Sequence, residues 1–272
     1  MSPSGRPKGQ QEPKRDGAEG GVISRPVFVR GDERTAADDG DALHFCSTCA
    51  FSQACLEQGM DKSELAQLHV LVEHTGPFHA GDVIFRRGDP FDAIAAVRGG
   101  SVKTSLVELD GRERVLGFHF PGEVIGLDGI DGDRYPCDAV ALDTVMLCRF
   151  SFPRMADLAT RLPLLQKHLF RLLSRDIHTA TRLGGDWSAD TRIAAFLVDI
   201  GRRLASRGFS ARRFELTMAR TDIANYLRLA PETVSRVLRR FQESGLVGVD
   251  RREIELVDLA RLTSIAAPAL AT

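Results

Sequence analysis

The spacing of apolar residues changes once along the chain, near Phe152-Pro153, and this change limits the possible folds more than any other feature. Between about residues 77 and 150, glycine recurs every few residues and separates short apolar runs such as Val83 to Phe85. Short runs between turn residues are typical of a β-sandwich or barrel. Asp110-Gly111 predicts a hairpin turn there, because Asp-Gly readily adopts positive φ angles. After Phe152 the spacing is helical, so we expect an α+β protein with its sheets first.

A long helix is expected from Pro163 to the Gly184-Gly185 pair, since proline suits a first helical turn and glycine a helix end. Its apolar residues fall near one stripe with roughly heptad spacing, which is typical of a dimerisation helix. The residues expected at that interface are Leu165, Leu169, Leu172, Ile177, Ala180 and Leu183. The same stripe could instead pack on its own domain. A second amphipathic helix is expected over about residues 188–206.

Residues 217–245 have the pattern of a helix-turn-helix. A short helix over about 219–227 is followed by three connecting residues and by a second helix that opens at Pro231 and ends at Gly245. The first turn of a recognition helix contacts base edges in the major groove, and basic residues on the next turn suit phosphates. The expected DNA contacts are Glu232, Thr233, Ser235, Arg236, Arg239 and Arg240. Apolar runs on both sides of residues 250–253 predict a hairpin wing with a basic tip. A helical hairpin with a solvated charged face is the alternative.

Charge is distributed unevenly along the chain. The 272 residues carry a net charge of −1, which by itself argues against a nucleic-acid partner. Residues 190–272, however, contain 14 arginines, no lysine and 10 acidic residues, so this part is +4 and the rest is −5. The C-terminal third is therefore expected to meet a polyanion. We find no nucleophile–base set and no phosphate-binding glycine loop, so we do not expect an enzyme.

Targeting signals are absent from the sequence as given. No apolar run approaches the ~18–20 residues of a membrane span, and the N-terminus has no signal-peptide apolar region. We therefore expect a cytoplasmic protein with no membrane contact. Residues 1–40 are rich in Gly, Pro, Ser and charged residues, which predicts a disordered tail.

Five cysteines remain to be explained. Cys46, Cys49 and Cys55 are closely spaced, whereas Cys137 and Cys148 lie far downstream in the glycine-punctuated region. Three near thiolates and one distant one could hold an iron–sulfur cluster or a tetrahedral zinc ion. Redox or structural thiols are the remaining interpretation. The spacing does not decide which distant cysteine completes the set.

Four segments together resemble the FNR branch of the FNR/CRP family of bacterial transcription regulators: CSTCAFSQAC, VIFRRGDPFDAIAAVRGGSVKT, GFHFPGEVIGLDGI and RTDIANYLRLAPETVSRVLRRFQ. The similarity covers about residues 44–265. It implies a cyclic-nucleotide-binding-like β-roll (jelly roll), a long dimerisation helix and a winged helix-turn-helix. It also implies an oxygen-labile 4Fe-4S cluster that promotes dimerisation when oxygen is scarce. The homodimer would bind a TTGAT-type palindrome in double-stranded DNA and, with RNA polymerase, control genes of anaerobic metabolism.

The resemblance also assigns residues. By position, the cluster ligands are Cys46, Cys49, Cys55 and Cys148, whereas Cys137 has no counterpart. The segment ETVSR places the base-reading residues at Glu232, Ser235 and Arg236. A regulator of the same fold that uses zinc, thiol redox chemistry or a small-molecule effector is the alternative. Pro121-Gly122-Glu123 is interpreted as a turn of the β-roll.

The implied organisation has five parts. They are a tail over 1–40, a cysteine-rich segment over 41–60, a β-roll sensor domain over 61–160, a dimerisation helix over 161–186 and a winged helix-turn-helix domain over 187–272.

Overall fold

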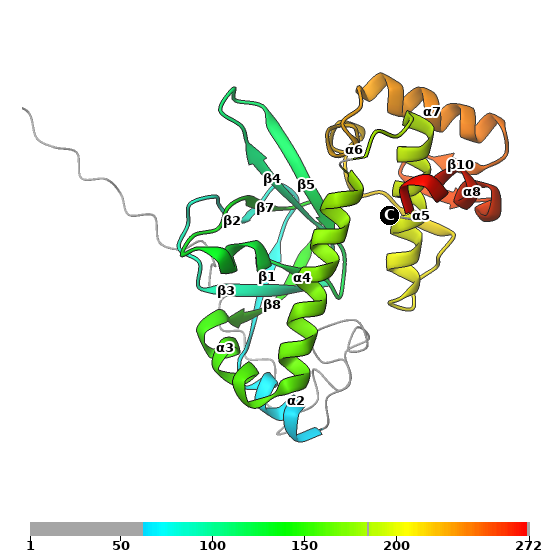
Figure 1. Cartoon of the computed structure of the whole chain (residues 1–272). Coiled ribbons are helices and arrows are strands. Elements are labelled where there is room, and N and C mark those ends of the chain that lie inside the picture. Colours follow the sequence, from blue (N-terminus) through cyan, green and yellow to red (C-terminus); the bar gives the residue numbers. More distant parts are fainter. Residues whose placement is uncertain (1–61, 184, 271–272) are drawn as a thin grey trace, which may run out of the picture.

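The computed structural model describes residues 62–183 and 185–270, so the expected tail and the segment with Cys46, Cys49 and Cys55 lie outside the described residues. A β-roll comes first, followed by a long helix along its side and a C-terminal domain beyond the end of that helix (Figure 1). The two four-stranded sheets of the β-roll have the orders β1-β8-β3-β6 and β2-β7-β4-β5. The strands are β1 Val72–Phe78, β2 Val83–Phe85, β3 Ala93–Gly99, β4 Val102–Val107, β5 Glu113–His119, β6 Val124–Ile125, β7 Asp138–Ala141 and β8 Val145–Ser151. The predicted fold of this region is confirmed.

The predicted hairpin turn joins β4 to β5. Gly111 has a φ of 81°, which an L side chain rarely adopts, and the Asp110 carboxylate accepts a hydrogen bond of 3.0 Å from the Arg112 backbone N–H. Between the two sheets, the core is apolar: Val102 and Leu147 are 0% exposed. A short 3-10 helix, η1, spans Leu127–Asp131 after β6.

Three helices accompany the β-roll: α2 Lys62–His69, α3 Phe152–Arg161 and α4 Pro163–Leu183. Leu165, Leu169 and Leu172 on α4 are 0%, 9% and 7% exposed, in a cluster with residues of α3 and the β-roll. This corrects the expected dimer interface for those three leucines, because their surface is already buried in their own chain. Ile177, by contrast, is 67% exposed. The side chains of Ala180 and Leu183 lie outside the described part.

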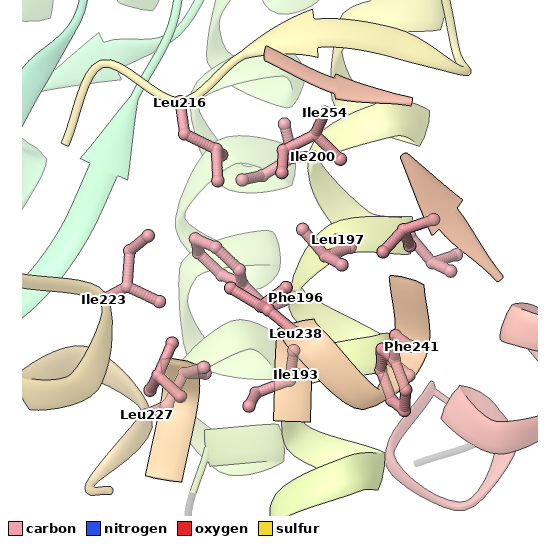
Figure 2. Close-up of a cluster of buried hydrophobic side chains, with 14 of the residues drawn as sticks. Ile193, Phe196, Leu197, Ile200, Leu216, Ile223, Leu227, Leu238, Phe241 and Ile254 are labelled. Carbon is pink, nitrogen blue, oxygen red and sulfur yellow. The ribbon is translucent and has the colours of Figure 1, made fainter. Parts of the chain in front are cut away.

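The C-terminal domain contains the predicted winged helix-turn-helix. Its elements are α5 Ala189–Ala205, β9 Arg213–Glu215, α6 Arg220–Leu227, α7 Pro231–Glu243, β10 Val247–Asp250, β11 Glu253–Leu256 and α8 Leu259–Leu270. Figure 2 shows how its core is built: Phe196 and Ile200 of α5 meet side chains from α6, α7 and the wing strand β11. Two elements of this domain were not predicted from the sequence: β9, which adds a third strand to the wing, and α8, which packs on α5.

The C-terminal domain and the β-roll share buried surface. Val115, Phe118 and Phe120, from β5 and the turn after it, belong to the same apolar cluster as Phe196 of α5. Rings from both domains meet, with the Phe118 and Tyr226 centroids 5.3 Å apart. The helix-turn-helix is therefore held against β5. No helix in the described ranges 62–183 and 185–270 is both long and apolar enough to cross a membrane.

Candidate nucleic-acid interface and metal-ligand cysteine

The connection between α6 and α7 sets the angle of the recognition helix. Arg228 ends α6 in the left-handed region, with a φ of 54°, and its backbone N–H bonds the carbonyl of Asn225 at 3.0 Å. Pro231 occupies the first turn of α7, where its missing N–H costs no helical hydrogen bond. The inner face of α7 is buried through Val234, Val237, Leu238 and Phe241. The opposite face of α7 is therefore turned outward.

That outward face carries the residues predicted to contact DNA. Glu232, Ser235, Arg236, Arg239 and Arg240 are exposed, and Thr233 is half-buried. The spacing of the five exposed residues follows one side of an α-helix. The positive end of the helix dipole lies at the same end of α7 as Glu232, which favours contact with an anionic polymer.

The two arginines farther along α7 are held by acidic partners. Arg239 Nε lies 2.9 Å from the Glu243 carboxylate, and Arg240 pairs with Asp190 in the first turn of α5. Among the described residues, Arg236 has no ion-pair partner in the structure. Its guanidinium can therefore form a bidentate hydrogen bond to a guanine without first breaking an ion pair.

The wing adds a second basic element. Strands β10 and β11 pair antiparallel from Val247↔Leu256 to Asp250↔Glu253. Arg251 and Arg252 form the exposed turn between them, with Arg251 at a φ of 53°. The hairpin predicted from the sequence is present, and its tip carries two cations suited to phosphates.

Cys148 is the one proposed cluster ligand within the described residues. It lies on β8 and pairs with His74 of β1 and Ala96 of β3 in the sheet. The side chain is half-buried, and its Sγ is 3.6 Å from His74 Nδ1, within hydrogen-bond reach. Burial lowers the pKa of His74, with a smaller contribution from Arg98. A partly accessible thiol on the sheet surface fits a metal ligand shared with another segment of the chain.

Cys137 has a different environment. It is 1% exposed and donates a hydrogen bond of 3.2 Å to the Asp128 carboxylate. Burial, followed by the charge of Asp128, raises the pKa of this thiol well above its usual range. Cys137 thus lies in the β-roll core, where burial and the contact with Asp128 disfavour the thiolate form.

Glu123 has a second role that was not predicted from the sequence. Its carboxylate accepts a hydrogen bond of 3.0 Å from the Phe120 N–H, which supports its predicted place in a turn. It also pairs with Arg203 in the last turn of α5 and with Arg207 in the turn after it, with Arg203 Nε 2.8 Å and Arg207 Nη2 2.9 Å from Oε1. Burial alone would raise the pKa of Glu123, but the two arginines lower it to about 2. A usable signal was present, because Arg203 and Arg207 continue the stripe of Phe196 and Ile200 at helical spacing.

Known proteins resemble both modules. Residues 76–161 match the cyclic nucleotide-binding domain, and residues 191–265 match the Crp-like helix-turn-helix domain. The chain is 40% identical over 224 residues to the transcriptional activator protein anr of Pseudomonas aeruginosa, covering 81% of this chain and 92% of that protein. It is 37% identical over 243 residues to the anaerobic regulatory protein of Haemophilus influenzae, covering 88% and 94%.

Among solved structures, FixK2 from Bradyrhizobium japonicum superposes with a TM-score of 0.65 at 27% identity, over 71% of this chain and 96% of that one. The relatives are regulators of transcription and not enzymes. The modules, their order and the identity over nearly the full length of the relatives agree: this chain belongs to the FNR branch of the FNR/CRP family of bacterial transcription regulators.

Proposed function

We propose that this protein is an oxygen-responsive regulator of genes for anaerobic or microaerobic metabolism, acting in the cytoplasm as a DNA-binding homodimer. The observation that carries the proposal is the match, over most of both chains, to proteins named anaerobic regulatory protein. The exposed recognition face of α7 and the wing supply the DNA-binding surface. Contact with RNA polymerase would follow from the role of the Pseudomonas aeruginosa relative, which is named a transcriptional activator.

The sensor would be a 4Fe-4S cluster held by Cys46, Cys49, Cys55 and Cys148. Four thiolates are a suitable donor set for such a cluster. Within the described residues, Cys148 supports this assignment because its thiol is half-buried on the sheet surface, whereas the Cys137 thiol is enclosed. When bound, the cluster would supply the chemistry that reacts with oxygen. Cys148 would tie the N-terminal cysteine segment to β8.

A dimer would form through the outer face of α4. Phe170 and Ile177 are 62% and 67% exposed, lie seven residues apart, and have half-buried Leu173 between them. That spacing suits a helix pair related by a two-fold axis. Two recognition helices about 34 Å apart would then meet successive major grooves of a palindrome, here of the TTGAT type.

The deciding experiment compares two cysteine variants. Wild-type, Cys148→Ser and Cys137→Ser proteins are purified without oxygen, and iron, sulfide and zinc are quantified in each. We expect about four iron and four sulfide per chain in wild type and Cys137→Ser, and a large loss in Cys148→Ser. One zinc per chain with no iron would instead support the zinc alternative. Equal iron in both variants would remove Cys148 from the ligand set.

Operator binding before and after air exposure completes this test. We expect a palindromic TTGAT-type DNA to be retained by the anaerobic protein and released after exposure to air. If protein shown to have carried the cluster retains the operator DNA equally well after air exposure, the result would contradict oxygen control by that cluster.

A further inference from the structure

The contact between the β-roll and the DNA-binding domain includes buried ion pairs beside its apolar core. Glu123 is 5% and Arg207 6% exposed, so these opposite charges are removed from water together. Arg203 also donates to the Phe118 carbonyl and lies over the Phe120 ring, 4.8 Å from its centroid. We call Glu123, Arg203 and Arg207 the Glu123 cluster. It joins the turn after β5 to the end of α5.

A second set of polar contacts joins β4 and β5 to α6. Lys103 Nζ lies 3.0 Å from Asp222 of α6 and 2.9 Å from Glu113 of β5. Asn225 of α6 accepts a hydrogen bond of 2.8 Å from the Val115 backbone N–H and donates one of 2.6 Å to the Glu113 carbonyl. Asn225 therefore satisfies backbone groups of β5 much as a neighbouring strand would.

These contacts are directional, whereas apolar packing alone is not. A buried carboxylate with two guanidiniums is satisfied only when the donors are correctly placed, since an unpaired buried charge is costly. The connection from α4 to α5 is short and includes Gly185, which has no side chain with which to fix a domain angle. The pKa of Glu123, at about 2, keeps the carboxylate charged throughout the physiological range.

The docked position leaves the DNA-reading face open. Glu232, Ser235 and Arg236 are exposed while the domain contacts the β-roll. Docking therefore orients the recognition helix without covering it. In a dimer, this orientation decides whether two recognition helices reach both half-sites at once.

We propose that Glu123, Arg203 and Arg207 are positioning residues for DNA binding: they fix the recognition helix relative to the β-roll, and so to the dimer, by an ion-pair cluster built from the chain's own side chains. The inference rests on the proposed function, because it requires a dimer on a palindromic operator. Removing an ion pair of the Glu123 cluster should reduce the increase in affinity that comes from binding two half-sites at once. That increase depends on the effective concentration of the second recognition helix at its half-site.

The test measures binding of anaerobically purified full-length protein to a palindromic operator and to a DNA with a single half-site. For Glu123→Gln and Arg203→Gln we expect at least a tenfold loss of affinity for the palindrome and less than a twofold change for the half-site. Arg202→Gln is the matched control, because Arg202 is exposed on the same helix. We expect it to bind both DNAs like wild type. Glu123→Asp keeps the charge and should recover part of the loss.

Hydrogen exchange provides the second measurement. In Glu123→Gln, amides of β5 and α6 should exchange faster, while those of α7 stay as protected as in wild type. Equal affinity ratios in wild type and both Gln variants would overturn the inference. A parallel loss on both DNAs would also overturn it, because it would show general unfolding of the DNA-binding domain. A wild-type protein that does not prefer the palindrome to the half-site would instead contradict the proposed dimeric function.

Discussion

His119, on β5 beside the Glu123 cluster, gives the fold a specific sensitivity to acid. Its Nε2 lies 3.0 Å from Thr104 Oγ1. Burial is the largest cause that lowers the pKa of His119; Glu123 opposes it, Arg203 and Arg175 add to it, and together these effects place the pKa at about 4. The folded protein thus keeps this ring neutral below pH 6.5, where the unfolded chain takes up a proton. Stability should therefore fall as the pH falls from about 6.5 to about 4.

His119→Gln should reduce that loss, since glutamine has a polar side chain that does not titrate. We expect the difference in unfolding free energy between pH 7 and pH 5 to be smaller in the variant, by on the order of 1–2 kcal/mol. Urea unfolding at both pH values measures it. His79→Gln, at an exposed position, is the control and should behave like wild type. An unchanged pH dependence in His119→Gln would contradict the assignment.

Single residues were predictable from the sequence where one element determines their surroundings. The exposed residues of α7 that we propose contact DNA follow from helical spacing, because its apolar stripe leaves one face outward. Helical spacing marks Arg203 as a residue on the inner stripe of its helix, but its pairing with Glu123 was not predictable, because the two lie 80 residues apart and meet only through the docking of two domains. The wing cations Arg251 and Arg252 were visible because both strands of the hairpin are local.

Helix α4 shows how one apolar pattern can serve two surfaces. Its sequence has approximate heptad spacing, but the helix packs against its own β-roll through Leu165, Leu169 and Leu172. Phe170 and Ile177 lie on the exposed side of the same helix. The spacing of apolar residues does not tell these two faces apart. An amphipathic helix with a broad apolar surface fits both the pattern of a helix packed on its own domain and the pattern of a dimerisation helix.

The two faces of α4 should respond differently to substitution. Leu165→Ala should lower the unfolding free energy by about 2–5 kcal/mol, because it leaves a cavity in a fully buried site. Ile177→Ser should change the unfolding free energy of the monomer by less than about 0.5 kcal/mol, as is usual for exposed positions. It should nevertheless weaken dimerisation. Urea unfolding and sedimentation of the anaerobic protein measure the two effects. Normal dimerisation of Ile177→Ser would rule out this face as the interface.

Across the whole molecule, the sequence predicted the modules and their order but not their docking. Each module follows from local periodicity, whereas the contact of β5 with α6 depends on side chains far apart in the chain, such as Lys103 and Asp222. The charge asymmetry has a structural meaning in this arrangement. The +4 region forms the C-terminal domain, where the recognition helix and the wing tip carry exposed arginines such as Arg236, Arg251 and Arg252, while the acidic excess lies in the rest of the chain.

This separation leads to a prediction about salt. Despite the net charge of −1, operator affinity should fall steeply and linearly on logarithmic axes as salt rises, because arginines that contact phosphates release counterions. Arg251→Ala should reduce the slope by about 0.9 and weaken binding to all sequences alike, as expected for one lost phosphate contact at the wing tip. Fluorescence anisotropy over a range of potassium chloride concentrations gives the slope.

Arg236→Ala is the matched comparison, because this side chain lies on the reading face of α7. It should cost about 1–3 kcal/mol of discrimination at one base pair of each half-site and leave the salt slope nearly unchanged. The reverse result, in which Arg251→Ala relaxes sequence preference and Arg236→Ala changes only the slope, would exchange the roles of wing and recognition helix. The two variants together thus separate the contacts that orient the protein on DNA from the contacts that read the DNA sequence. Both kinds of contact belong to a domain with a net charge of +4, although the whole chain has a net charge of −1.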